Sequence, residues 1–171
     1  CLRKYCAPAD DLPNHDPADA QGLNFIVIRY SEVLLTYAES LIEQNKDLGL
    51  AADAINKVRN RVSLPDVTAT DQVGLRKILR NERRVEFAFE GLRWYDIKRW
   101  KIGAQVMNGP VYGVRPGTVN MTTGAVNFSS PNHITVGDNR VFNESRDYYF
   151  PIPQEDLDAD QALIGHQNPG W

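Results

Sequence analysis

The pattern of apolar and polar positions predicts two consecutive helices between residues 29 and 62. The first helix is indicated by apolar residues with helical spacing: Val33, Leu34, Tyr37, Ala38, Leu41 and Ile42. Polar residues and Gly49 follow, where the helix is expected to end. The second helix is indicated by Ala51, Ala54, Ile55, Val58 and Val62. Because the connection is short, the helices are expected to run antiparallel as a hairpin.

Further helices are predicted up to about residue 102. Asp71 is a suitable N-cap for a third helix, whose apolar positions continue to Val85 and Phe89. Gly91 is expected to interrupt this helix, and residues 92–101 then form a shorter one. The hairpin at 29–62 is compatible with one tetratricopeptide-like unit, which cannot bury both of its faces alone. It therefore needs neighbouring helices.

Helical periodicity ends at about residue 103. Residues 103–147 are rich in Gly, Asn, Pro, Thr and Val, and we expect loops with short strands around residues 111–112 and 134–136. The remaining residues, 148–171, begin extended and continue into a short acidic helix, whereas residues 1–28 form an irregular lead-in. The predicted fold is mainly α: a tetratricopeptide-like helical hairpin and further helices at 29–102, with a long loop-rich segment and short strands.

Composition and charge exclude several classes of partner. The 171 residues are 42% hydrophobic and 24% charged, which is ordinary for a globular protein. The net charge of −3, from 19 basic and 22 acidic residues, provides no basic face for nucleic acid. No apolar run approaches the roughly 20 residues that cross a bilayer. The chain starts on Cys1 without the apolar core of a signal peptide, so a processed or truncated product is expected.

The two cysteines, Cys1 and Cys6, leave three interpretations open. They could form a small-loop disulfide, Cys1 could be the lipidated first residue of a lipoprotein, or both could be incidental thiols. The last interpretation is favoured, because isolated cysteines carry a weak signal.

Metal ligands are sparse in the sequence. The three histidines, His15, His133 and His166, lie far apart, and no pair has the spacing of a zinc site. Aspartates at 156, 158 and 160 resemble the start of a calcium loop, but Gln161 and Gln167 stand where such a loop needs Gly and Glu. We expect neither a metal nor another cofactor.

The densest group of charges is the ladder Glu82, Glu86 and Glu90, spaced for one helical face. Two of these carboxylates, Glu82 and Glu86, could serve as the acid and base of a glycosidase. However, arginines lie within reach, and a ladder neutralised by arginines is more often a structural ion network. The sequence also has no nucleophilic-serine elbow, phosphate loop or dinucleotide motif. Catalysis is therefore not expected.

Aromatic residues are the remaining candidates for ligand contact. Trp94, Tyr95 and Trp100 could stack on sugar rings, but their helical spacing favours a place in the core. The better ligand-binding candidates lie in or beside the loop-rich segment: Tyr112, Phe128, Tyr148 and Tyr149.

Five segments, in order along the chain, carry a resemblance: RYSEVLLTYAES at 29–40, AINKVRNR at 54–61, ERRVEFAFEGLRWYDIKRW at 82–100, FPIP at 150–153 and QNPGW at 167–171. They resemble motifs of the SusD/RagB family of nutrient-binding outer-membrane lipoproteins. Residues 103–147 match no motif, and Trp171 stands where the family more usually has Tyr. Residues 2–5 resemble a piece that precedes the first helix, so the resemblance places Cys1 in mid-chain and the anchoring cysteine in a missing N-terminal portion.

The resemblance implies a non-catalytic protein that faces outward from the outer membrane on a lipid anchor. Such proteins cap a SusC-like TonB-dependent transporter and deliver oligosaccharides to it, or in some members peptides. The motif at 82–100, called the signature motif below, is shared by members with different ligands, which suits a structural role. Its structural residues are Glu82, Arg83, Arg84, Glu86, Glu90, Arg93, Trp94 and Trp100. The alternatives are a scaffold that docks on the transporter with its ligand site elsewhere and, with least support, the glycosidase.

Overall fold

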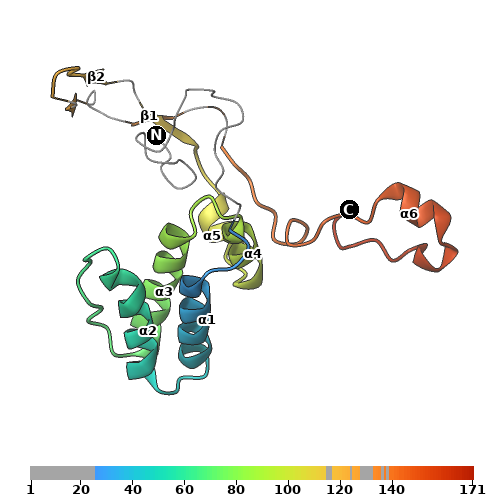
Figure 1. Ribbon diagram of the computed structural model, residues 1–171. Helices are drawn as coiled ribbons and strands as arrows, with labels where there is room; N and C mark the ends of the chain where they lie inside the picture. Colours follow the sequence, from blue (N-terminus) through green and yellow to red (C-terminus); the bar gives the residue numbers. More distant parts are fainter. Residues whose placement is uncertain (1–25, 115–116, 124, 128–132, 136, 138) are drawn as a thin grey trace, which may run out of the picture. The chain divides into compact units, whose positions relative to one another are not determined.

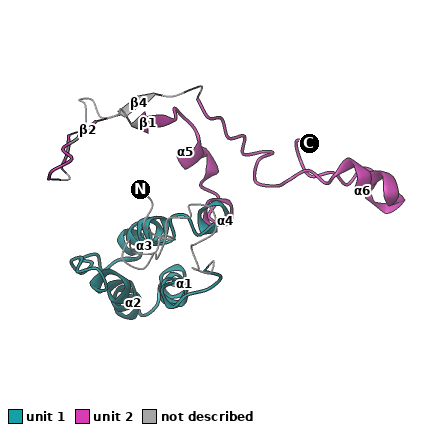
Figure 2. Cartoon of the chain, turned by 45° about the horizontal axis from the view of Figure 1, so that its top comes forward, with its two compact units in different colours: residues 1–94 teal, residues 95–171 magenta. Residues whose placement is uncertain are grey.

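The computed structural model describes residues 26–114, 117–123, 125–127, 133–135, 137 and 139–171 (Figure 1). The chain divides into two compact units, residues 1–94 and 95–171 (Figure 2). The described elements are mostly helices, joined by turns and a loop-rich segment with short paired strands. The predicted fold class is confirmed.

Three helices form the first unit: α1 (Tyr30–Glu43), α2 (Leu48–Asn60) and α3 (Gln72–Glu86). The turn between α1 and α2 is tight, because Asn45 and Asp47 adopt the left-handed backbone conformation with φ of 52° and 46°. The two helices pack as the predicted hairpin, and α3 packs against both of them (Figure 1).

Helix α3 begins where the sequence predicts and ends earlier. The Asp71 side chain accepts a hydrogen bond of 2.9 Å from the Gly74 backbone N–H, so the predicted N-cap is confirmed. The prediction that the helix continues to Phe89 is wrong, because the backbone turns left-handed at Phe89 (φ 65°) and Gly91 (φ 79°). Helix α4 (Leu92–Arg99) starts after this turn.

The core of the first unit lies between the three helices. Its fully or almost fully buried residues are Leu35, Ala38, Ile42, Ala51, Ala54, Ile55, Val58, Leu75, Leu79 and Phe87. The predicted apolar face of α2 is buried, as expected, except at Val62, which lies beyond the helix and is 52% exposed. For α1 the predicted stripe is partly wrong. Leu35 is buried, whereas Val33 and Tyr37 are 55% and 47% exposed.

The second unit contains short elements. Strands β1 (Tyr112–Val114) and β4 (His133–Thr135) lie close to where the sequence predicts short strands, and they pair antiparallel with Tyr112 opposite Thr135. Strands β2 (Thr118–Val119) and β3 (Val126–Asn127) form a second antiparallel pair. Helix α5 (Gly103–Met107) lies in the segment expected to hold only loops and strands. The predicted acidic helix is α6 (Gln154–Ala159), and the 3-10 turn η2 (Gln161–Leu163) follows it.

A small aromatic cluster holds the start of the second unit. The rings of Phe142 and Tyr148 meet edge to face with centroids 4.9 Å apart. The Tyr148 hydroxyl accepts a hydrogen bond of 2.9 Å from the Gly103 backbone N–H. A side chain at position 103 would collide with the Phe142 ring, because a Cβ atom there would lie 2.4 Å from it. Glycine at the start of α5 is therefore a packing requirement.

Candidate functional site

The signature motif forms an ion network with residues of other elements. Arg29, just before α1, binds both oxygens of Glu90 through its Nε and Nη2 atoms, at 2.9 Å each. Its Nη1 atom donates a hydrogen bond to Glu86 at 2.5 Å, and Glu86 also accepts one from Arg61 at 3.0 Å. The paired guanidinium and carboxylate planes give a fork geometry, which is the strongest form of such a contact. These contacts form an ion network of carboxylates and arginines, and the arginines in them come from outside the signature motif.

Phe87 lies at the centre of this network. Its ring is 2% exposed, and the guanidinium groups of Arg29 and Arg83 lie over it at 5.0 and 5.1 Å from the centroid. Cation–π attraction therefore adds to the burial of the ring. Arg83 also lies 3.9 Å from Glu39 of α1 and is only 5% exposed. The motif thus ties α3 to α1 and to the segment before it.

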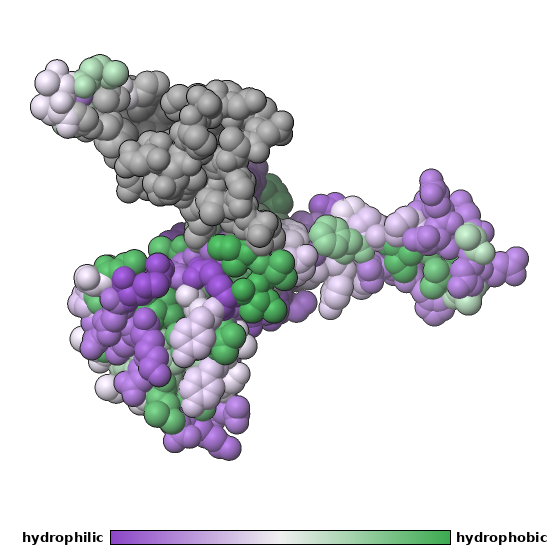
Figure 3. All heavy atoms as spheres, viewed as in Figure 1, coloured by the Kyte–Doolittle hydropathy of each residue, from purple (hydrophilic) through white to green (hydrophobic). Residues whose placement is uncertain are grey.

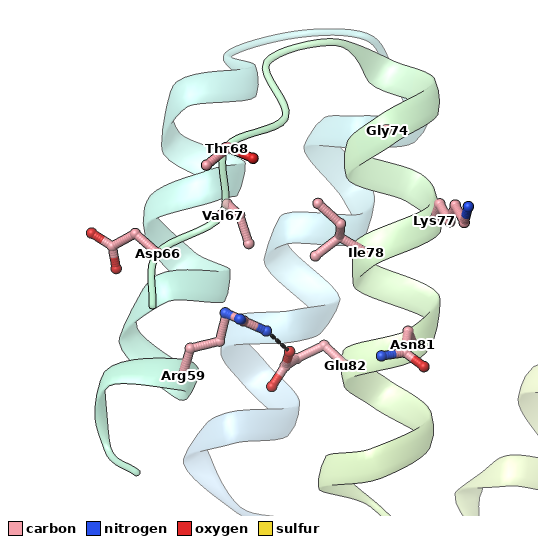
Figure 4. A pocket seen from close by; sticks show the side chains of 9 residues that line it. All are labelled: Arg59, Asp66, Val67, Thr68, Gly74, Lys77, Ile78, Asn81 and Glu82. Atoms are coloured by element: carbon pink, nitrogen blue, oxygen red, sulfur yellow. Dashed lines mark hydrogen bonds and ion pairs between the residues drawn. The ribbon is translucent and has the colours of Figure 1, made fainter. Parts of the chain in front are cut away.

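The third carboxylate, Glu82, lines a groove between α2, the following segment and α3. Arg59 donates to it at 2.7 Å, and the two side chains point toward each other across the groove (Figure 4). Val67 and Ile78 line the groove above this pair, and its volume is about 510 Å³. The Arg59 Nε atom also donates to the Pro65 carbonyl at 2.8 Å, which fixes the segment that follows α2.

Ion pairs therefore connect three of the five motifs to one another. Arg29 comes from the first motif, Arg59 and Arg61 from the second, and the carboxylates from the third. The sequence analysis did not single out these three arginines as partners. Their signal was present, since each is a charged residue at the end of an apolar helical stripe, but only the tertiary structure brings them to the carboxylates.

Ion pairing shifts the pKa values of Arg29 and Glu86. Burial lowers the pKa of the Arg29 guanidinium, but the hydrogen bonds to Glu90 and Glu86 outweigh burial and leave the pKa raised. Burial raises the pKa of the Glu86 carboxyl, whereas the hydrogen bond and charge of Arg29 lower it, and the net result is a pKa below the usual 4.5. Both shifts favour the charged forms of Arg29 and Glu86 at neutral pH.

We expect the network to weaken in acid. Because the pKa of Glu86 is lower in the folded state than the usual 4.5, its stabilising contribution is complete above that pH and is lost as the pH falls toward the folded-state pKa. Denaturant unfolding of wild type and Glu86→Gln at a series of pH values below 7 tests this. The variant, which lacks the titrating group, should lose less stability than wild type across this window. Parallel pH profiles would contradict the role assigned to Glu86.

The geometry gives no support to the glycosidase alternative. Glu82 lines the groove with Arg59, whereas Glu86 and Glu90 line a different depression with Arg29 and Arg61. Glycoside hydrolysis needs two carboxylates that face one substrate. In the part of the chain that the structure describes, Glu82 and Glu86 face arginines instead.

The remaining signature residues lie around α3 and α4. Arg84 is exposed and donates to Asn81 at 3.2 Å. Arg93, Trp94 and Trp100 are partly buried, and the Arg99 guanidinium lies 4.7 Å from the Trp100 ring centroid. Trp94 and Trp100 are thus partly in the packing, as their spacing favours, but the same prediction is wrong for Tyr95, which is 68% exposed.

The last two motifs bind each other through a side-chain amide. The Gln167 Oε1 atom accepts a hydrogen bond from the Ile152 N–H at 2.8 Å, and its Nε2 atom donates to the Ile152 carbonyl at 3.0 Å. Asn168 donates to the Phe150 carbonyl at 2.6 Å, and the Trp171 indole donates to the Tyr149 carbonyl at 3.2 Å. We call these contacts the C-terminal clamp. They close the neck of the loop that carries α6 (Figure 1).

The described residues contain neither a cluster of metal ligands nor a membrane-spanning helix. Within that part of the chain, no three His, Cys, Asp or Glu side chains gather as a metal site would require. Nor does any helix described there combine the length and the apolar character needed to cross a membrane. His15, Cys1 and Cys6 lie outside the described residues.

A similar sequence and fold occur in known proteins. The model of the SusD family matches residues 2–171. This chain belongs to the SusD family.

Relatives of this SusD-family chain are much longer than the chain itself. It is 35% identical over 156 residues to a SusD-like protein, P2, from Formosa agariphila, a match that covers 86% of the chain and 26% of the relative. A solved SusD-like protein from Bacteroides fragilis shares the fold with a TM-score of 0.71 and 37% identity, over 86% of this chain and 26% of that one. A second, described as a SusD-like carbohydrate binding protein from the same species, has a TM-score of 0.66 and 38% identity, over 80% and 28%. The chain thus spans about a quarter of their length.

The ligand candidates of this SusD-family chain differ in their surroundings. Tyr112 on β1 is 61% exposed and Tyr149 is 52% exposed. Tyr148 is only 9% exposed, and the Lys101 ammonium group lies 4.3 Å from its ring centroid and 4.9 Å from that of Tyr149. A sugar that stacked on Tyr148 would have to displace Lys101, so Tyr112 and Tyr149 are the more accessible candidates. Phe128 lies outside the described residues.

Proposed function

We propose that the full-length protein binds nutrient glycans at the outer face of the outer membrane and delivers them to a SusC-like TonB-dependent transporter. A lipid anchor on the N-terminal portion would hold it at the membrane. The observation that carries the proposal is the match of the SusD family model to residues 2–171. The relative from Bacteroides fragilis described as carbohydrate binding, at 38% identity, favours a glycan as the ligand.

The arrangement of the motifs supports a binding role for residues outside them. Arg29, Glu86, Glu90 and the clamp residue Gln167 use their polar groups in contacts with one another or with the backbone. These contacts hold the scaffold, so ligand recognition falls to exposed side chains elsewhere. Aromatic rings such as those of Tyr112 and Tyr149 offer flat apolar faces, which suit the apolar face of a pyranose.

Affinity electrophoresis of the full-length protein through gels that contain different polysaccharides tests glycan binding. We expect retention by at least one polysaccharide. Circular dichroism should first show that the full-length protein is helical, so that the gels test a folded protein. A folded protein that no glycan retains would count against a glycan ligand and favour a peptide, the alternative that the family allows.

Alanine variants locate the site. If Tyr112 or Tyr149 stacks on the ligand, its replacement should weaken binding by about tenfold or more, which corresponds to roughly 1.4 kcal/mol. Tyr95→Ala is the matched control, because this tyrosine is also exposed (68%) and belongs to the signature motif. Binding that survives the Tyr112 and Tyr149 replacements would move the site to other residues, and this portion would then serve as a scaffold.

Delivery to a transporter has its own test. A SusC-like barrel encoded next to the gene of this protein would be the partner for co-purification. We expect the two proteins to elute together from an affinity column that holds the tagged barrel. Separate elution from a correctly folded barrel would contradict the proposed partnership.

A further inference from the structure

Lys101 closes the turn that ends helix α4 in a conformation that lysine rarely adopts. Its backbone N–H donates to the Lys98 carbonyl at 3.2 Å, and the Ile102 N–H donates to the Ile97 carbonyl at 3.2 Å. These two hydrogen bonds form a helix-ending turn whose left-handed residue is usually glycine. Here that residue is Lys101, with φ of 53°. A lysine kept where glycine would be less strained favours a role for the side chain itself.

The Lys101 ammonium group lies against two tyrosine rings. Its Nζ atom is 4.3 Å from the Tyr148 ring centroid and 4.9 Å from the Tyr149 ring centroid. The Tyr148 ring is itself held by its edge-to-face contact with Phe142 and by the hydrogen bond from Gly103. Cation–π attraction to a fixed ring restrains a side chain that would otherwise sample many rotamers. A restrained cation loses less conformational entropy when it binds a ligand.

No carboxylate pairs with this ammonium group among the residues that the structure describes. Lys101 is exposed, and its contacts there are the two rings and the backbone hydrogen bond of the turn. The Asp147 carboxylate is engaged by Arg146 at 2.7 Å. Lys98, which shares the turn, adds a second cation, 3.8 Å from the Phe150 ring centroid. The turn therefore presents positive charge beside the tyrosines.

The chemistry around this turn fits an acidic sugar. Around α6, the surface of the second unit is mostly hydrophilic, with small hydrophobic areas, which favours a polar ligand (Figure 3). An acidic sugar combines a ring with an apolar face and a carboxylate or sulfate group that accepts charge-assisted hydrogen bonds. The Lys101 ammonium group has three N–H donors, and none of them makes a hydrogen bond to a tyrosine ring face in the ordinary sense. Donors therefore remain for such an anion.

We propose that Lys101 gives the protein a preference for acidic glycans, because it binds the uronate carboxylate or the sulfate ester of a sugar that lies on the Tyr149 ring. Tyr149, which is 52% exposed, supplies the stacking surface, and Lys101 beside it supplies the opposite charge. The inference rests on the proposed function, since it names the chemical class of the glycan that the protein binds.

Polysaccharides that differ only in charge test this preference in the full-length protein. Polygalacturonate is compared with its methyl ester, and dextran sulfate with dextran, by isothermal titration calorimetry. We expect a charged member to bind more tightly than its neutral counterpart, and the pair that responds distinguishes carboxylate from sulfate. Lys101→Gln should weaken that binding by about tenfold or more, as expected for one lost charge-assisted hydrogen bond. Lys101→Arg, which keeps the charge, should retain most of it.

Lys46→Gln is the matched control, because it removes the same charge from an exposed lysine in the turn after α1. It should leave binding unchanged, and the unfolding midpoints of all variants separate loss of fold from loss of ligand. Equal losses in Lys46→Gln and Lys101→Gln would mean unspecific attraction and would overturn the inference. Equal binding of charged and neutral polysaccharides would overturn it while glycan binding stands. A folded protein that binds neither form would overturn the proposed function as well.

Discussion

Replacing Arg29 with alanine is expected to lower the free energy of unfolding by about 3–5 kcal/mol, the usual cost of removing one partner from a buried ion pair. The Glu90 and Glu86 side chains that Arg29 binds are only 3% and 10% exposed. Without the guanidinium, these carboxylates would keep their desolvation cost and lose their main compensating charge. The Phe87 ring would also lose one of its two cation–π partners.

Arg76→Ala is the matched control for this variant. Arg76 makes the same two-pronged contact with Glu43, at 2.8 and 2.7 Å, but the Glu43 side chain is 43% exposed. Exposed pairs contribute about 0–1 kcal/mol, so the control should cost far less. Denaturant unfolding of both variants measures the difference. Equal losses would mean that burial does not determine the strength of the Arg29 network.

Phe87→Ala is the second large effect, with an expected loss of about 3–5 kcal/mol for truncating a buried phenylalanine. The ring is 2% exposed and belongs to the core cluster of the first unit. Its removal would leave a cavity beneath two arginines, and water that entered it would weaken the ion pairs. Because Phe87 and Arg29 are in contact, we expect the double variant to cost less than the sum of the single losses.

Phe89→Ala provides the comparison within the same motif. Phe89 lies two residues further along and is 69% exposed, so its truncation should change the free energy of unfolding by at most about 0.5 kcal/mol. Unfolding midpoints of the two variants, measured under identical conditions, separate the positions. A loss at Phe87 no larger than that at Phe89 would contradict the central place of Phe87 in the core.

The helices were predictable because their signals are local. The period of apolar residues defines α1 and α2, and the Asp71 cap defines the start of α3. The end of α3 was missed because Phe89 adopts a left-handed conformation, which a bulky residue rarely does. Gly91 predicts an interruption of the helix, but no local pattern predicts that the turn begins several residues before it.

The face of α1 that is buried could not be read from the sequence alone. Apolar residues surround much of this helix, and the choice between Leu35 and Tyr37 depends on where α2 and α3 pack. Partners of the carboxylates were missed for a similar reason. Sequence spacing reveals arginines on the same helix, whereas Arg29 and Glu90 are 61 positions apart.

The candidate ligand residues were the least predictable. They lie in or beside a segment without periodicity, and the direction of an aromatic side chain in a loop depends on contacts made elsewhere. Tyr148 illustrates this, since the Lys101 ammonium group lies over its ring and the Gly103 backbone N–H donates a hydrogen bond to its hydroxyl. Tyr149, the next residue in the sequence and also a tyrosine, is half exposed.

The C-terminal clamp has an evolutionary consequence. Because Gln167 holds Ile152 by both backbone hydrogen bonds, the ends of the intervening loop are fixed whatever the loop contains. Lengthening a closed loop costs little, with each doubling adding only about 0.6 kcal/mol. The segment with α6 and η2 is therefore a place where insertions, deletions and exchanged sequences can accumulate without disturbing the scaffold, and where members of one lineage are free to diverge.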